Sequence, residues 1–311
     1  MDKLAGLALA ALLLLPLGGC DRGKAPVVEP PALDVDFLAD DAAWRAERRQ
    51  DLLRPDGWTS LVGLHWLELK AHYLGSSAGS GIRLAVGPPR LGLVEQRDGR
   101  LYFTPERGVA LTLDGAPLKG RVELHSDHDP QPSLLGFDQG KGLLAVIKRG
   151  DRFGLRVKHA DAPSRLQFTG VESWPADPGW KLEGRLLPHP PGKTLPIVDI
   201  IGTAIDASNP GVVEFIRDGK TYRIEAMGEP GQPLFLVFAD RTSGHGSYPA
   251  GRFMDVPGAD AQGRVVLDFN RAYNPPCAFT PFATCPLPPP ENRLDLAITA
   301  GEKAYVPAKS H

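Results

Sequence analysis

The chain has 311 residues, of which 42% are hydrophobic and 23% are charged, and its formal net charge is −2 at pH 7. This balance, with a sequence pI of about 6.5, argues against the basic surface that binds nucleic acid or an anionic membrane. The 35 glycines and 31 prolines, spread among many short apolar runs, favour an all-β fold.

Residues 1–19 are predicted to be a signal peptide. Lys3 is followed by an apolar and small-residue stretch up to Gly19, which is slightly shorter than the ~20 residues of a bilayer span and ends in small residues as a cleavage site does. The ending Leu17-Gly18-Gly19-Cys20 resembles a bacterial lipobox. The resemblance implies cleavage before Cys20, lipidation of Cys20 and anchoring to a membrane. The alternative is an uncleaved helix with a chance cysteine.

Residues 20–33 contain the lipidated cysteine and a Pro-rich polar tether, which would hold the folded part off the bilayer. A protein of this kind is expected in the cell envelope, facing the periplasm or the cell exterior, and the sequence leaves open which membrane carries it. In that oxidising compartment, and with Cys20 lipidated, the remaining Cys277 and Cys285 are expected to form one disulfide.

Residues 34–174 are predicted to form a first half that combines one amphipathic helix with many strands. The helix is expected from Asp34 to Leu53, where acidic residues lead and basic residues follow, and Pro55 and Gly57 end it. Its apolar side is expected to pack on the sheet. A hairpin is expected over residues 143–159, where KRGDRFG separates two alternating runs. Single strands are expected over residues 59–69, 82–86, 91–96, 101–106, 109–115, 121–127 and 166–174.

The run WPADPGW at residues 174–180 indicates a boundary, so that residues 175–311 form a second β-rich half. FIRDGKTYRI is a strong hairpin signal, because Asp-Gly lies between β-branched and aromatic residues. Other strands are expected over residues 195–205, 233–240, 252–256, 264–270 and 294–300. The predicted fold class is therefore mainly β, with an N-terminal amphipathic helix followed by two sandwich- or barrel-like halves.

Polar side chains are dense between the strands of the second half, at strand ends and in Gly-rich turns where binding groups are commonly presented. Arginines and carboxylates occur there beside aromatic residues, which suits a polar pocket with a stacking wall. The predicted ligand-binding residues are Asp240, Arg241, Thr242, Tyr248, Arg252, Asp268, Asn270, Tyr273, Asn274 and Asn292. The alternative is that these residues bind one another in a buried ion-paired network that orders a loop-rich region.

The stretch LDFNRAYNPPCAFTPFATCPLPPPENRL, residues 267–294, is expected to be a rigid, stapled loop between two strands. Its prolines fix φ and withhold N–H donors, which excludes a central strand. Closing the loop between the two cysteines would stabilise the fold by about 2.5 kcal/mol in the chain-entropy model. The loop would hold Asn270, Tyr273, Asn274 and Asn292 in place.

The motif FADRTSG…Y…GRFM…VVLDFNRAYNPPCAFTPFATCPLPPPENRL…AGEK resembles the signature of the bacterial family called domain of unknown function 1684. The opening WTSLVGLHWLELKAHYLGSSAGSGIRL is similar to the N-terminal block of that family, so the resemblance extends over residues 40 to 306. It implies a fold and supplies no activity, and His245 falls in the more variable part of the motif.

Enzymatic interpretations each lack a required element. SSAGSGI, residues 76–82, has Ala78 where the G-x-S-x-G elbow needs glycine. Ser247, His245 and Asp240 would supply a Ser-His-Asp set, but closeness in sequence is not geometry. Asp240, Asp255, Asp268 and Glu291 offer glycosidase carboxylates, with none marked out as a pair.

No cofactor or metal site is predicted. HSDHD, residues 125–129, has two histidines and two aspartates but precedes a proline, which favours an exposed turn. The sequence therefore favours a lipid-anchored envelope protein that binds a small polar or glycan-like ligand in a C-terminal polar pocket. The alternative is an envelope hydrolase that uses a carboxylate or His245 in the same region.

Overall fold

The computed structural model describes residues 35–307. The predicted signal peptide, Cys20 and the tether lie outside the described residues. Within residues 35–307, none of the helices combines the length and the apolar character needed to cross a bilayer.

One long helix begins the described chain. Helix α1 spans Val35–Leu53 and buries Phe37 and Leu52, close to the predicted bounds. Its C-terminal Leu52 packs in a cluster with Phe168 and Phe279, both carried by loops. The C-terminal end of helix α1 therefore packs against the loops that carry Phe168 and Phe279. Shorter helical elements are α2 (Pro163–Leu166), η1 (Trp58–Ser60), η2 (Asp138–Gly140), η3 (Pro178–Trp180), η4 (Phe269–Arg271), η5 (Pro276–Ala278) and η6 (Pro290–Asn292).

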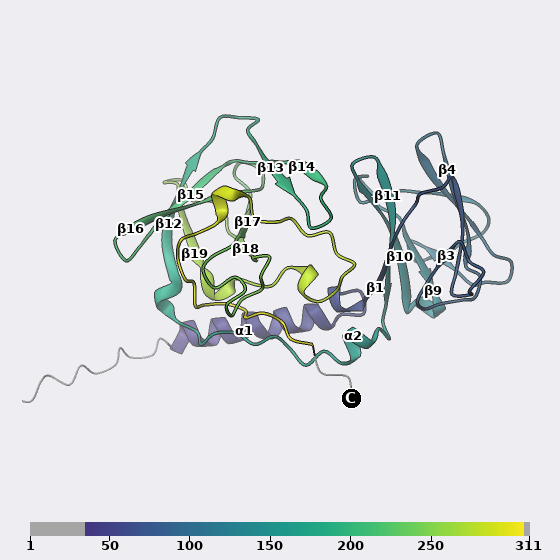
Figure 1. Ribbon diagram of the computed structural model, residues 1–311, viewed down its shortest axis with the longest axis horizontal. Coiled ribbons are helices and arrows are strands. Elements are labelled where there is room, and N and C mark those ends of the chain that lie inside the picture. The colour runs from purple at the N-terminus through teal and green to yellow at the C-terminus, as the bar shows by residue number, and fades with distance from the viewer. Residues whose placement is uncertain (1–34, 308–311) are drawn as a thin grey trace, which may run out of the picture. The chain divides into compact units, whose positions relative to one another are not determined.

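The first half contains two sheets (Figure 1). One has the order β1-β11-β10-β9-β6-β7 and the other β3-β2-β4-β5-β8. The predicted hairpin at 143–159 is confirmed as β10 paired with β11. The strands are β1 (Leu61–Trp66), β2 (Ala71–Gly75), β3 (Ile82–Arg83), β4 (Gly92–Arg97), β5 (Arg100–Pro105), β6 (Thr112–Leu113), β7 (Ala116–Pro117), β8 (Val122–Leu124), β9 (Leu134–Phe137), β10 (Gly142–Arg149) and β11 (Arg152–His159).

The apolar face of each of these sheets contributes to one core. Val94 and Phe103 from the second sheet are buried in the same cluster as Leu144 and Leu155 from the first. Side chains alternate between the two faces of a strand, so burying one face leaves the other available for different partners. The first half is therefore sandwich-like, as expected.

The second half contains a sheet of order β16-β15-β12-β19 and the pairs β13-β14 and β17-β18. The Asp-Gly hairpin is confirmed as β15 paired with β16, and Asp218 and Gly219 take positive φ values of 50° and 74°, as a type I′ turn requires. A core cluster that includes Phe215, Leu236 and Met254 joins the strands. The strands are β12 (Lys181–Pro188), β13 (Thr194–Val198), β14 (Ala204–Ser208), β15 (Gly211–Arg217), β16 (Lys220–Ala226), β17 (Leu234–Phe238), β18 (Arg252–Val256) and β19 (Arg264–Asp268).

Residues 195–205, predicted as one strand, instead contain most of β13, a turn and the start of β14, which pair as a hairpin. Two other predicted strands are absent. Residues 166–174 contain the end of α2 and then irregular backbone, because their carbonyls bind partners other than a strand: Thr169 O accepts from Arg49 and Trp174 O accepts from Arg45. Residues 294–300 are also irregular. There the Ile298 N–H donates to a carboxylate, Asp240 Oδ2, 3.1 Å away. An apolar run alone therefore overpredicted strand structure at both places.

Candidate functional site

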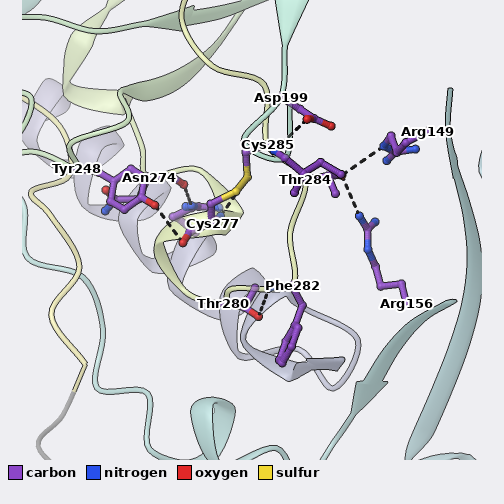
Figure 2. The surroundings of a disulfide bond; sticks show 12 residues. Arg149, Arg156, Asp199, Tyr248, Asn274, Cys277, Thr280, Phe282, Thr284 and Cys285 are labelled. Carbon is purple, nitrogen blue, oxygen red and sulfur yellow. Dashed lines mark hydrogen bonds between the residues drawn. A yellow bond between two sulfur atoms is a disulfide. The ribbon is translucent and has the colours of Figure 1, made fainter. Parts of the chain in front are cut away.

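The two C-terminal cysteines form the predicted disulfide. Cys277 and Cys285 are joined, with Cα atoms 6.1 Å apart, and Figure 2 shows the bond and its surroundings. Tyr248 donates its hydroxyl hydrogen to Cys277 O at 3.2 Å. The disulfide closure of the predicted loop is thus confirmed, and Tyr248 contacts the backbone of the loop. The prediction that the loop joins two strands is wrong, because no strand follows it within the described residues.

Residues 277–285, which the disulfide closes into a loop, form the disulfide loop. This loop contacts both halves of the described chain. Cys285 and Ala283 are buried with Val237 and Phe253 of the β17-β18 pair. On the other side, Thr280 donates its hydroxyl hydrogen to the backbone oxygen of Leu61 in β1, 3.3 Å away. The loop therefore works as a connector as well as a turn.

The centre of the predicted binding cluster is a buried ion pair. Arg252 Nη2 lies 2.8 Å from Asp240 Oδ2, and the side chains are 1% and 0% exposed. Arg252 also donates to the carbonyl oxygens of Ile298 and Ala300. Burial lowers the pKa of Arg252, and the adjacent carboxylate of Asp240 opposes this shift. The pair thus satisfies the backbone of residues 298–300, which explains why they need no strand neighbour.

The other carboxylate oxygen of Asp240 organises the turn after β17. Thr242 donates both its N–H (2.9 Å) and its hydroxyl hydrogen (2.6 Å) to Asp240 Oδ1. The Ser247 hydroxyl lies 2.9 Å from that of Thr242. His245 is exposed, and its Nδ1 lies 3.3 Å from the backbone oxygen of Ser243. Ser247 is hence tied to Thr242, an arrangement unlike that of a serine nucleophile on a histidine base.

Three predicted asparagines join segments that are distant in sequence. Asn292 donates to the carbonyl oxygens of Glu225 and Val237, both at 2.9 Å. Asn270 donates to Asp177 O at 2.9 Å and to Asp268 Oδ1 at 3.0 Å. The third, described next, contacts a buried glutamate. All three are buried. Asn292 joins its segment to strands β16 and β17, and Asn270 joins its segment to the residue before η3.

Asn274 connects the cluster to helix α1. Its backbone N–H donates to Glu302 Oε2 at 2.6 Å, and Glu302 Oε1 lies 3.1 Å from Arg48 Nε. Arg48 also donates to Asn274 O at 3.0 Å, and its guanidinium carbon lies 4.5 Å from the Tyr273 ring centroid. Among residues 35–307, Asn274 Oδ1 is buried with no hydrogen-bond partner. Arg48 thus belongs to the same buried polar network as Asn274 and Glu302.

The remaining candidates have surface partners. Arg241 pairs with Asp295, and these side chains are 66% and 60% exposed. Tyr273 donates its hydroxyl hydrogen to Asp255 Oδ2 at 2.7 Å, and burial raises the pKa of Tyr273. The structure thus brings Asp240, Thr242 and Arg252 together and joins Tyr273 to Asn274 through Arg48. Asn292 is hydrogen-bonded to the segment just before Asp240, through Val237 O and the N–H of Ala239. Asn270 instead contacts Asp177 and Asp268.

A cavity of about 440 Å³ lies beside this network, against helix α1, and its lining includes none of the ten predicted ligand-binding residues. We call it the α1 groove. It is lined by Trp44, Arg45, Ala46, Arg48, Arg49, Leu52, Phe168, Thr169, Gly170, Val171, Glu172, Ser173 and Glu302. Its volume falls within the ~300–1,000 Å³ range of small-molecule sites.

The guanidinium groups of the groove are held by backbone carbonyls. Arg45 Nη2 donates to Trp174 O at 3.1 Å and Arg49 Nη1 donates to Thr169 O at 2.6 Å. Gly170 has φ +120°, and a Cβ atom there would come 2.5 Å from Arg49 Nη1. A guanidinium has five N–H donors, so these bonds orient the arginines and leave donors for a ligand.

Acidic groups partly balance this charge. Arg45 Nε lies 2.6 Å from Asp41 Oδ2, and burial raises the pKa of Asp41 despite the neighbouring arginine. Glu302 is 2% exposed and pairs with Arg48. Among the ion pairs of residues 35–307, none involves Arg49. The groove therefore offers mixed donors and acceptors with one uncompensated cation.

The α1 residues of the groove are absent from the predicted site, because the helix was predicted only to pack on the sheet. Trp44, Arg45, Arg48 and Arg49 have the spacing i, i+1, i+4 and i+5, which places them on one face of a helix. An aromatic residue with three arginines on one face was the available signal. Residues 168–173, which line the groove together with the helix, could not be recognised as part of a site because residues 166–174 were predicted to form a strand.

The histidine–aspartate run at 125–129 forms a turn. Asp129 Oδ2 accepts from the N–H of Ser126 at 2.6 Å, and Asp127 pairs with Arg149. Within the described part of the chain, no three His, Cys, Asp or Glu side chains come together so as to hold a metal ion.

Comparisons with known proteins agree with part of the sequence resemblance. No curated protein matches the chain. The solution NMR structure of an uncharacterized protein of Haloarcula marismortui is 29% identical over 45% of this chain and 78% of that chain, with a TM-score of 0.38. Residues 166–303 match the family model described as "Protein of unknown function (DUF1684)". The chain is therefore similar to this family over a stretch that contains the Asp240–Arg252 pair, Asn274 and Glu302 and excludes helix α1 with Arg48.

Proposed function

We propose that the protein binds a small, glycan-like ligand with an anionic group in the α1 groove, and that it does so as an envelope protein anchored through lipid on Cys20. The observation that carries the proposal is the composition of the groove: three arginines and a tryptophan of one helix face a strip of loop backbone and the carboxylate of Glu302. Sugars offer hydroxyl groups to such donors and acceptors, and an aromatic wall suits their apolar faces.

The buried polar network supports the site and reaches it through Arg48 and Glu302. Glu302 contacts the ligand cavity, while both of its oxygens are held by Arg48 and Asn274. A carboxylate fixed in this way is preorganised for binding. Because its oxygens already accept hydrogen bonds from the protein, it is poorly suited to act as a nucleophile. This favours binding over the alternative of a carboxylate hydrolase.

An anionic sugar is the natural choice of ligand because Arg49 has no carboxylate partner among residues 35–307 and the arginine fork matches a carboxylate in a bidentate manner. Isothermal titration with glucuronic acid, and with glucose as its neutral counterpart, tests this. Glucuronic acid should bind saturably and glucose more weakly. Equal affinity for the two sugars would contradict the charge argument.

Two variants test the location. Arg49→Gln and Trp44→Leu should each weaken glucuronic acid binding by about tenfold, the loss of one charged hydrogen bond or one stacking contact. Arg223→Gln is the matched control, because Arg223 is 65% exposed and pairs with Glu214 in the β15-β16 hairpin. Binding that survives both groove variants would rule out the α1 groove.

A further inference from the structure

The first half presents a basic sheet face toward the disulfide loop. Arg149 lies opposite Arg152, Ala145 opposite Arg156, and Leu143 opposite Lys158 in the β10-β11 pair. Directly opposed residues project from the same face of an antiparallel pair, so Arg149, Arg152, Arg156 and Lys158 share one face. The opposite face, with Leu144 and Leu155, is buried in the core.

Two arginines of this face converge on one neutral oxygen atom. Arg149 Nε lies 3.3 Å and Arg156 Nη2 lies 3.5 Å from Thr284 Oγ1, as Figure 2 shows. Thr284 belongs to the disulfide loop and directly precedes Cys285. A single hydroxyl is a weak acceptor for two cations, whereas a carboxylate offers about four lone-pair positions.

Arg156 lacks a counter-charge. Arg149 is balanced by Asp127, 2.7 Å away, but no ion pair within residues 35–307 includes Arg156. Its Nε is buried without a hydrogen-bond partner among the described residues. Burial lowers the pKa of Arg156, and the nearby Arg149 acts in the same direction. Arg156 is half-buried, and its guanidinium carbon lies 5.3 Å from the Trp58 ring centroid. Because removing a cation from water is costly unless it is paired, this position is suited to an anion.

A cavity of about 420 Å³ opens beside these groups. We call it the junction pocket. It is lined by Asp127, His128, Lys148, Arg149, Gly150, Ile197, Asp199, Ile205, Met227, Phe235, Thr284 and Pro286. One wall is apolar and comes from β13, β14, β17 and the residue after β16. Arg149 and Thr284 belong to the lining, and Arg156, which lies outside the lining, reaches the Thr284 hydroxyl.

The two acidic residues of the lining do not compete for this position. Asp127 is held by Arg149 and by the N–H of Lys148. Asp199 accepts from the N–H groups of Ile201 and Thr203, at 3.0 and 2.8 Å. Arg149 is neutralised by Asp127, and Lys148 projects from the opposite face, with its ammonium 5.5 Å from the Phe153 ring centroid. Beside the pocket, the cation without an ion-pair partner among the described residues is therefore Arg156.

We propose that the junction pocket binds an amphiphilic carboxylate whose charged oxygens lie between Arg149 and Arg156. The hydrocarbon part of the ligand packs against the apolar wall. The Thr284 hydroxyl, which accepts from both arginines, donates its own hydrogen to the carboxylate. This site is separate from the α1 groove, and it does not depend on the function proposed for that groove.

Three small probes separate the contributions of charge and tail. Hexanoate carries both, acetate carries only the charge, and hexanamide carries the tail with a neutral head group. Calorimetric titration at constant ionic strength should give saturable binding of hexanoate, with hexanamide and acetate at least about tenfold weaker. Equal affinity for hexanoate and hexanamide, or no saturable binding of hexanoate, would overturn the proposal.

Variants assign the binding to these residues. Arg156→Met and Thr284→Val should each weaken hexanoate binding by about tenfold, because each removes a hydrogen bond to a charged group. Thr284→Val is the milder change and serves if Arg156→Met does not fold. Arg152→Met is the matched control: it lies on the same basic face, but it is exposed and stacks on Trp66, 4.5 Å away. Arg49→Gln should leave hexanoate affinity unchanged. Full affinity in Thr284→Val, or an equal loss in Arg152→Met, would show that the junction pocket is not the site.

Discussion

Replacing Arg252 by methionine should cost the protein a large part of its stability. The change removes the charge but keeps most of the volume, and it leaves Asp240 buried with no cation. Breaking a buried pair by removing one partner typically costs about 3–5 kcal/mol, out of a total stability of roughly 5–15 kcal/mol. Arg252 also binds the carbonyl oxygens of Ile298 and Ala300, so the upper part of this range is expected.

Urea denaturation followed by circular dichroism measures this effect, and a thermal scan should show a midpoint lower by roughly 10 °C, given about 2–4 °C per kcal/mol for domains of this size. Arg241→Met is the matched control. Arg241 lies in the same sequence motif, but its partner Asp295 is exposed and their pair is on the surface, where ion pairs contribute little.

A double-mutant cycle guards against a general packing effect. Asp240→Asn combined with Arg252→Met should cost less than the sum of the single changes, because the second replacement removes a charge that the first has already stranded. If Arg252→Met is as stable as Arg241→Met, or if the costs simply add, the buried pair is not a stabilising unit and the reasoning fails.

Three further predictions concern the rest of the chain. Replacing Cys277 and Cys285 together by alanine should lower stability by about 2.5 kcal/mol in the chain-entropy model, measured by urea denaturation against the wild type with its disulfide intact. Burial lowers the pKa of His65 in the folded state. The stability that neutral His65 contributes is therefore present above the unfolded pKa of about 6.5 and is lost as the pH falls below that value. Between pH 7.5 and pH 5, the His65→Gln variant should lose less stability than the wild type, and identical slopes of stability against pH would show that His65 does not titrate as stated. Cys20→Ser should release the protein from the membrane fraction and abolish labelling by radioactive palmitate, whereas a labelled Cys20→Ser protein would exclude Cys20 as the lipidation site.

Local chemistry made much of the fold predictable. Asp218 and Gly219 specify a hairpin because their positive φ values are needed at that turn and few other residues accept them. The alternation of apolar and polar residues along β10 and β11 likewise predicts a half-buried sheet. These signals depend on neighbours in sequence, and a single sequence displays them.

The predictions that proved wrong concern segments whose structure depends on partners that are distant in sequence. Residues 294–300 have the composition of a strand, yet Arg252 and Asp240 satisfy their backbone from across the fold. The ten candidate residues were predicted as a cluster, and many of them do join one buried network. Sequence could not tell a network from a pocket, since both use arginine, aspartate and asparagine. The α1 groove needed the pairing of a helix with residues 168–173, more than 100 positions later.

We propose that the polar signature residues build a scaffold while the ligand binds in the α1 groove beside it. An NMR titration of isotopically labelled protein with glucuronic acid tests this most directly. Shifts are expected at the Trp44 indole N–H and at the backbone amides of residues 168–173, with little change at residues 240–248. Shifts confined to residues 240–248, with the Trp44 signal unmoved, would contradict it.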